Sequence, residues 1–187
     1  MTTKTIAKLG LLTAVALVLG YVDSMIPIST IPGIKLGLSN TVLLYAIFLL
    51  DAKSAWILMF LKVGLSGLMF GGVTAMLYSF AGGLLSLSAM LLMRRVKGMS
   101  MIGVSVTGAV MHNVGQMIVA CLVVQSRAIL AYFPILLIAA VVTGILTGIV
   151  AKSAIRGIDA YAHHKNGTQP ADSAPADKQQ STEESSQ

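Results

Sequence analysis

Long apolar runs separated by short polar breaks constrain this chain more than any other feature of its sequence. Hydrophobic residues make up 56% of the chain and charged residues 11%, whereas soluble domains usually carry about 25% charged residues. Each run approaches the roughly 20 residues that a helix needs to cross the hydrocarbon of a membrane. The sequence therefore predicts an all-α integral membrane bundle of six transmembrane helices. The predicted spans cover residues 5–22, 36–50, 54–70, 73–93, 99–124 and 129–151.

The lysines and arginines lie at the ends of these runs and orient the predicted bundle. If the N-terminus is cytoplasmic, only Lys35 and Arg127 fall on the outer side. The basic residues on the inner side are then Lys4, Lys8, Lys53, Arg94, Arg95, Lys97, Lys152 and Arg156. Basic residues concentrate on the cytoplasmic side of membrane proteins, so we expect a multi-pass protein of the bacterial plasma membrane with both termini in the cytoplasm. The same rule accounts for the net charge of +6 without a nucleic-acid partner.

The two ends of the chain differ in character. Lys4 and Lys8 precede an apolar run that resembles a signal peptide, but no small-x-small cleavage site follows, and we interpret the run as a retained first span. Residues 1–158 form the predicted transmembrane domain. Residues 159–187 are rich in polar residues and are expected to form a disordered cytoplasmic tail. Cys121 is the only cysteine, so no disulfide framework exists.

The fifth predicted span carries polar side chains near its middle. His112 and Gln116 are one helical turn apart and Gly108 precedes them by another turn, so the three share a face, whereas Asn113 points about 100° away. Polar groups at this depth are costly in lipid and usually face a partner, a cavity or a ligand. They either bond helix to helix or line a ligand path. A metal site is disfavoured because the other histidines, His163 and His164, lie in the tail.

Lys62 falls near the middle of the third predicted span, too deep to reach either surface easily. Its ammonium needs an acidic partner, backbone carbonyls, water or an anionic ligand. Asp23 and Asp51 are predicted at membrane edges, unless the first connection folds inward and brings Asp23 down. Lys62 is therefore either a ligand contact or a structural lysine that caps carbonyls or is neutralised by burial.

The first outer connection combines Pro32 and Gly33 with Lys35, and Ser39 and Asn40 follow at the start of the second span. The positive end of a helix dipole favours anionic groups, and Lys35 adds to the same field. The segment is consistent with a lid over a ligand site that includes Lys35 and Asn40. It is equally consistent with an interfacial turn that an anchoring lysine holds at the membrane surface.

Small residues recur at intervals of four in several predicted spans. Gly144 and Gly148 form a GxxxG motif on the sixth span, and Gly10 and Ala14 lie four apart on the first. On the fourth span the small residues are Ala75, Ser79 and Gly83, with Gly82 and Ser86 beside them. Such residues let helix backbones approach closely in lipid. They indicate packing within one chain, or the docking of a second membrane protein on the first span.

Several chemical functions lack their signature in this sequence. No G-x-x-x-x-G-K-[ST] motif is present, so the chain does not itself power transport as a Walker-type ATPase. The aspartates are scattered and form none of the clusters by which prenyl-diphosphate synthases hold magnesium. No nucleophile, base and orienting acid occur as a set. We therefore predict no enzymatic activity in this chain alone, no catalytic residue, no metal site and no cofactor.

Three motifs in one order resemble a known family. Residues Pro32–Asn40, Tyr78–Gly83 and His112–Gln116 are similar to those of the Gx transporter family, which is also labelled heptaprenyl diphosphate synthase component I. Pro134 and the segment Thr143–Gly148 fit as well. The resemblance covers roughly residues 5–158. The family in turn resembles the six-helix substrate-binding S components of energy-coupling-factor vitamin transporters.

This resemblance implies a fold, a site and partners. An S-component-like bundle would hold its ligand toward the outer half, under the first outer connection. Its first helix would dock a transmembrane coupling subunit that works with ATPases, through Gly10 and Ala14 in this chain; S components usually carry two alanines there, and this chain has Gly10 instead. Relatives often lie near genes for flavin-transferring or quinone-linked electron-transfer proteins, which implies a redox-related ligand.

Three functions follow as hypotheses. The first is a membrane-embedded substrate-binding subunit for a small vitamin-, flavin-, quinone- or isoprenoid-related ligand. For it we predict a ligand cavity lined by Lys62, His112, Asn113, Gln116, Lys35 and Asn40. The second is a non-catalytic membrane accessory subunit in heptaprenyl diphosphate or quinone biosynthesis. The third is a membrane component of flavin-linked extracellular electron transfer.

Overall fold

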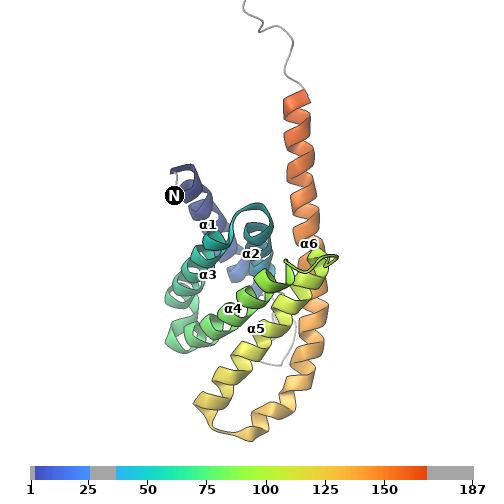
Figure 1. The fold of residues 1–187 in the computed structure, drawn as a ribbon. Helices are drawn as coiled ribbons and strands as arrows, with labels where there is room; N and C mark the ends of the chain where they lie inside the picture. Colours follow the sequence, from blue (N-terminus) through green and yellow to red (C-terminus); the bar gives the residue numbers. More distant parts are fainter. Residues whose placement is uncertain (1–2, 26–36, 168–187) are drawn as a thin grey trace, which may run out of the picture. The chain divides into compact units, whose positions relative to one another are not determined.

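The computed structural model describes residues 3–25 and 37–167, and every regular element within them is helical (Figure 1). The α-helices are α1 (Thr3–Met25), α2 (Leu38–Leu49), α3 (Ala52–Ser66), α4 (Gly72–Met93), α5 (Met101–Val124) and α6 (Phe133–Gly167). A π-helical turn, η1 (Gly67–Gly71), joins α3 to α4, and a 3₁₀ segment, η2 (Arg127–Tyr132), precedes α6. The chain divides into two compact units, Met1–Ala154 and Ile155–Gln187. The described part of the second unit continues the helix of α6.

The short helix α2 is the best-buried element of the first unit. Its 12 residues would extend about 18 Å, well short of the roughly 30 Å of membrane hydrocarbon. After the polar residues of its first turn, the helix is apolar on every side, which is the pattern of a helix covered all round. Its buried residues are Ser39, Thr41, Val42, Leu43, Leu44, Ala46 and Ile47. The guanidinium of Arg94 donates to the carbonyl of Ile47 and lies 5.7 Å from the ring centroid of Phe48, so it closes the C-terminal end of α2.

Helices α3 and α4 form a hairpin through η1. The stretch Ala52–Met93 contains 42 residues, and a straight helix of that length would extend about 63 Å, about twice the thickness of the hydrocarbon. The chain instead reverses direction after η1 (Figure 1). Gly72 has a φ of 68°, which a residue with a side chain adopts only with strain. This turn separates the third and fourth predicted spans.

Glycines set the close contact between the antiparallel helices α4 and α5. A Cβ atom on Gly115 would lie 2.6 Å from the carbonyl oxygen of Ala81, and one on Gly82 would lie 2.8 Å from Cε1 of His112. A Cβ atom on Gly108 would likewise collide with the side chain of Met90. The two backbones therefore approach as closely as small residues permit in lipid.

The predicted GxxxG motif packs within the chain. A Cβ on Gly144 would lie 2.7 Å from the Cα of Val106, and one on Gly148 would lie 2.9 Å from the Cα of Ile102. Both glycines thus bring α6 against α5. Gly10 on α1 is exposed, and a Cβ added to it would have no atom within 4 Å; Ala14 is exposed too. Gly10 and Ala14 are therefore not used for packing among the described residues.

The helices agree in type with the predicted all-α membrane bundle, but the count of six spans is not confirmed. Within the described residues, four stretches are long and apolar enough to cross a membrane: Thr3–Asp23, Ala52–Met93, Met101–Val124 and Ile129–Ile158. The second predicted span is a shorter apolar helix, and the third and fourth share one stretch. Helix α6 also continues past residue 151, where the sixth span was predicted to end, and takes in residues 159–167 of the predicted tail. The rest of that tail lies outside the described residues.

Candidate functional site

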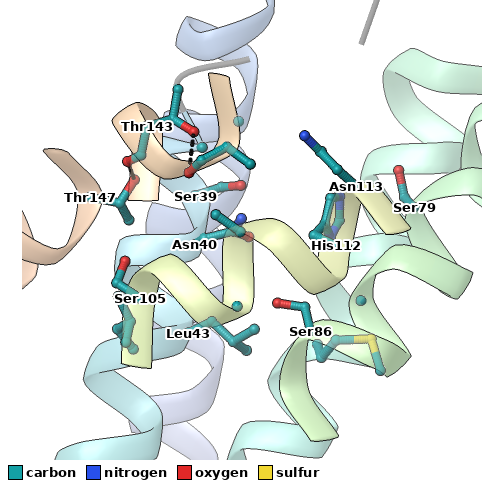
Figure 2. A pocket seen from close by; sticks show the side chains of 18 of the residues that line it. Ser39, Asn40, Leu43, Ser79, Ser86, Ser105, His112, Asn113, Thr143 and Thr147 are labelled. Atoms are coloured by element: carbon teal, nitrogen blue, oxygen red, sulfur yellow. Dashed lines mark hydrogen bonds between the residues drawn. The ribbon is translucent and has the colours of Figure 1, made fainter. Parts of the chain in front are cut away.

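A polar cavity of about 140 Å³ lies inside the first unit, among α1 to α6 (Figure 2). At about 10–15 Å³ for one water molecule, this volume corresponds to about ten water positions. Its polar lining residues are Asp23, Ser39, Asn40, Lys62, Ser66, Ser79, Ser86, Ser105, His112, Asn113, Gln116, Thr143 and Thr147. The remaining wall is formed by glycine, alanine, leucine, valine and methionine. A cavity this rich in hydrogen-bonding groups, enclosed by apolar helices, is suited to a polar ligand.

One corner of the cavity is organised by Lys62 and Asp23. The ammonium of Lys62 donates to Oδ1 of Asn40 at 2.7 Å, which joins α3 to the first turn of α2. The carboxylate of Asp23 accepts from the backbone N–H of Gly37 at 2.9 Å, and its side chain is only 5% exposed. Asp23 thereby holds the end of α1 against the start of α2. Charge-assisted bonds of this kind are stronger than neutral ones, so both bonds help to fix the start of α2.

The opposite wall comes from α5. The ring of His112 lies against the backbone of Gly82, because only a residue without a Cβ leaves room for it there. Asn113 donates from Nδ2 to the carbonyl of Leu136 on α6 at 2.9 Å. Its carboxamide therefore bonds helix to helix and also borders the cavity. Gln116 lines the cavity one turn beyond His112.

Small hydroxyl side chains complete the wall on four helices. Ser39 on α2, Ser86 on α4, Ser105 on α5 and Thr143 on α6 surround the same open space (Figure 2). Thr147 donates to the carbonyl of Thr143 at 2.7 Å, the usual way in which a hydroxyl satisfies itself within a helix.

Five of the six predicted ligand-binding residues line this one cavity. They are Asn40, Lys62, His112, Asn113 and Gln116. The sixth, Lys35, lies outside the described residues. That these side chains bind a ligand stays a prediction. The predicted docking residues Gly10 and Ala14 lie away from the cavity, on the exposed face of α1.

Sequence reasoning missed several residues of the lining. Asp23 was predicted at a membrane edge unless the first connection folds inward, and it was not included among the ligand-binding residues, yet it lines the cavity together with Lys62. Ser79, Gly83 and Ser86 were interpreted as packing residues of the fourth span, and they also border the cavity. The hydroxyl groups of Ser79 and Ser86 were the available signal for these two positions. Alanine would pack as closely there, so serine could have indicated a cavity.

The comparisons with known proteins point to a single family. A family model described as heptaprenyl diphosphate synthase component I matches residues 12–154. This range contains every residue that lines the cavity. The comparisons with curated proteins and with solved structures gave no match.

Proposed function

The chain belongs to the heptaprenyl diphosphate synthase component I family, and from that premise we propose that it is a membrane-embedded substrate-binding subunit. It captures a small ligand in the cavity and relies on a separate ATPase module of the energy-coupling-factor type. The observation that carries this proposal is the clustering of the half-buried ammonium, imidazole and carboxamide groups of α3 and α5 around one space. Such groups are costly among lipid chains, and a ligand cavity explains why they occur together.

The proposal includes a membrane arrangement. The hairpin of α3 and α4 supplies two spans, α2 supplies a short one, and α1, α5 and α6 supply the other three. The protein then crosses the bacterial plasma membrane six times with both termini in the cytoplasm. The basic residues at the C-terminal end of α4, Arg94, Arg95 and Lys97, support this orientation.

Native mass spectrometry of the full chain, purified in a mild detergent, tests the ligand-binding function. We expect a fraction of the protein to carry a bound small molecule that is released on unfolding. The Lys53→Ser variant is a control that should carry the same fraction of bound molecule as the parent protein, because Lys53 is exposed at the start of α3 and does not line the cavity. Protein that never carries a small molecule, even when it is released directly from its native membrane, would contradict the proposal.

Docking of a coupling subunit would require a surface on α1 that a second helix can approach closely. Gly10, Ala14 and their exposed neighbours Ala7 and Leu11 form a smooth strip on this helix. Replacing Gly10 by leucine should reduce the amount of coupling subunit and ATPase that co-purifies with the chain by at least about tenfold, because a close helix contact tolerates no bulky side chain. Gly157→Leu is the matched control, since Gly157 also has no atom near a Cβ position. Equal recovery of the module with both variants would contradict docking at this strip.

A second function is favoured by the family description. The chain would then be a non-catalytic accessory subunit of heptaprenyl diphosphate synthesis, which anchors a polyprenyl synthase at the membrane or handles its product. Reconstituting the chain with a polyprenyl synthase and measuring chain length and rate separates the two functions. A change in product length would favour the accessory role, and an unchanged product would favour the substrate-binding role.

A further inference from the structure

The charges of the described residues that line the cavity balance. Among the described residues that line it, Lys62 carries a positive charge and Asp23 a negative one, with His112 counted as neutral. No arginine occurs in this described lining. The ammonium of Lys62 already donates to Asn40, and the carboxylate of Asp23 accepts from Gly37. The other polar groups of the lining are uncharged carboxamides and hydroxyls.

Three hydroxyls on buried residues of the cavity lack a partner within the described part of the chain. Ser39 is 8% exposed, Ser86 2% and Ser105 4%, and none of their hydroxyls bonds to another described residue. Other hydroxyls of the same helices do: Ser88 donates to the carbonyl of Leu84 at 2.7 Å, and Thr107 to that of Gly103 at 3.0 Å. The three serine hydroxyls border the cavity, whereas Ser88 and Thr107 do not line it. The threonines of the lining differ from these serines, because the hydroxyls of Thr143 and Thr147 donate to carbonyls of their own helix.

The three serine hydroxyls open onto the cavity and are available to an occupant. Alanine at these positions would give the same close packing without a group that bonds to water or to a ligand. Water or a ligand in the cavity can therefore supply the missing bonds. Because a hydroxyl both donates and accepts, three of them on three helices suit an occupant with both kinds of group on its rim.

From this arrangement we infer that the ligand is a small molecule of zero net charge with several hydrogen-bond donors and acceptors, and that it is not a prenyl diphosphate. This inference rests on the proposed substrate-binding function. A diphosphate would bring several negative charges to a lining whose described residues supply one ammonium and one buried carboxylate, and buried charges without partners are strongly unfavourable. The cavity of about 140 Å³ is also smaller than the roughly 300–1,000 Å³ that drug-sized ligands occupy, so a single ring suits it better than an isoprenoid chain.

Binding of defined probes to the full-length protein in nanodiscs tests the inference. The uncharged single-ring probes are nicotinamide, pyridoxine and thymine, and the anionic probes are inorganic pyrophosphate and isopentenyl diphosphate. We expect at least one uncharged probe to raise the melting temperature and neither anionic probe to do so. Ser86→Ala should then lower the affinity for that probe by about three- to tenfold, because about one hydrogen bond is lost. Ser88→Ala is the matched control two residues away on α4, because Ser88 is exposed and bonds to its own helix.

The possible outcomes separate this inference from the proposed function. Binding of an anionic probe that is weakened by Ser86→Ala would overturn the ligand class and leave the substrate-binding function standing. Binding of no probe of either kind would count against both. Binding of an uncharged probe with equal affinity for Ser86→Ala and Ser88→Ala would place it outside this cavity and overturn the inference.

Discussion

Gly115→Ala is expected to destabilise the protein by about 1–3 kcal/mol, as overpacking of a tight interior contact does. The added methyl group would lie 2.6 Å from the carbonyl oxygen of Ala81 and 2.9 Å from the Cα of Gly82. Both are backbone atoms of α4, so no side-chain rotation can relieve the clash. The helices must move apart, which disturbs the wall that His112 and Gln116 provide. Thermal unfolding in detergent, followed by the fluorescence of Trp56, measures the effect.

Gly64→Ala is the control for this experiment. Gly64 lies on α3 and has no atom within 4 Å of a Cβ position. Alanine favours the helical state over glycine by up to about 1 kcal/mol, so this variant should melt at the same temperature as the parent protein or slightly above it. If Gly115→Ala melted as high as Gly64→Ala, the close contact between α4 and α5 would not exist as described.

The helices could be predicted well because the signal for them lies in the chain itself. Apolar runs bounded by glycine, charged residues or proline marked most helix ends to within a few residues, as the agreement for α4 and α5 illustrates. The length of α2 was also visible as a short run. That α2 is the buried centre of the first unit could not be read in the same way, since a short apolar helix can lie at an edge or in a core.

The cavity was only partly predictable for a similar reason. Lys62, His112, Asn113 and Gln116 stood out because each is polar inside an apolar run. Asp23 did not, since its position near the end of a span is compatible with a membrane edge, and only the hydrogen bond to Gly37 brings it to the cavity. The serines of the lining were predicted only as small packing residues. A serine that packs between helices and a serine that faces a cavity give the same sequence pattern, so only the tertiary structure distinguishes them.

The largest effect on ligand binding is expected from Lys62→Met. The side chain of Lys62 holds the carboxamide of Asn40 through a bond of 2.7 Å at the first turn of α2. Removing a hydrogen bond to a charged group costs about 1.5–3 kcal/mol, which corresponds to about a ten- to 150-fold loss of affinity if the ligand relies on this geometry. Native mass spectrometry should therefore find far less co-purified small molecule on Lys62→Met than on the parent protein. Lys53→Met removes an exposed lysine of the same helix and should leave the bound fraction unchanged.

Thermal unfolding of the same two variants, read together with the bound fraction, distinguishes a binding role of Lys62 from a structural one. Methionine keeps most of the length of lysine, but it leaves the carboxamide of Asn40 without the hydrogen bond from Lys62, and removing one partner of such a bond is destabilising. We therefore expect Lys62→Met to lose its ligand and also to melt below Lys53→Met in the ligand-free state. A variant that retained the bound molecule but melted well below Lys53→Met would show that Lys62 supports the fold at α2 rather than the ligand.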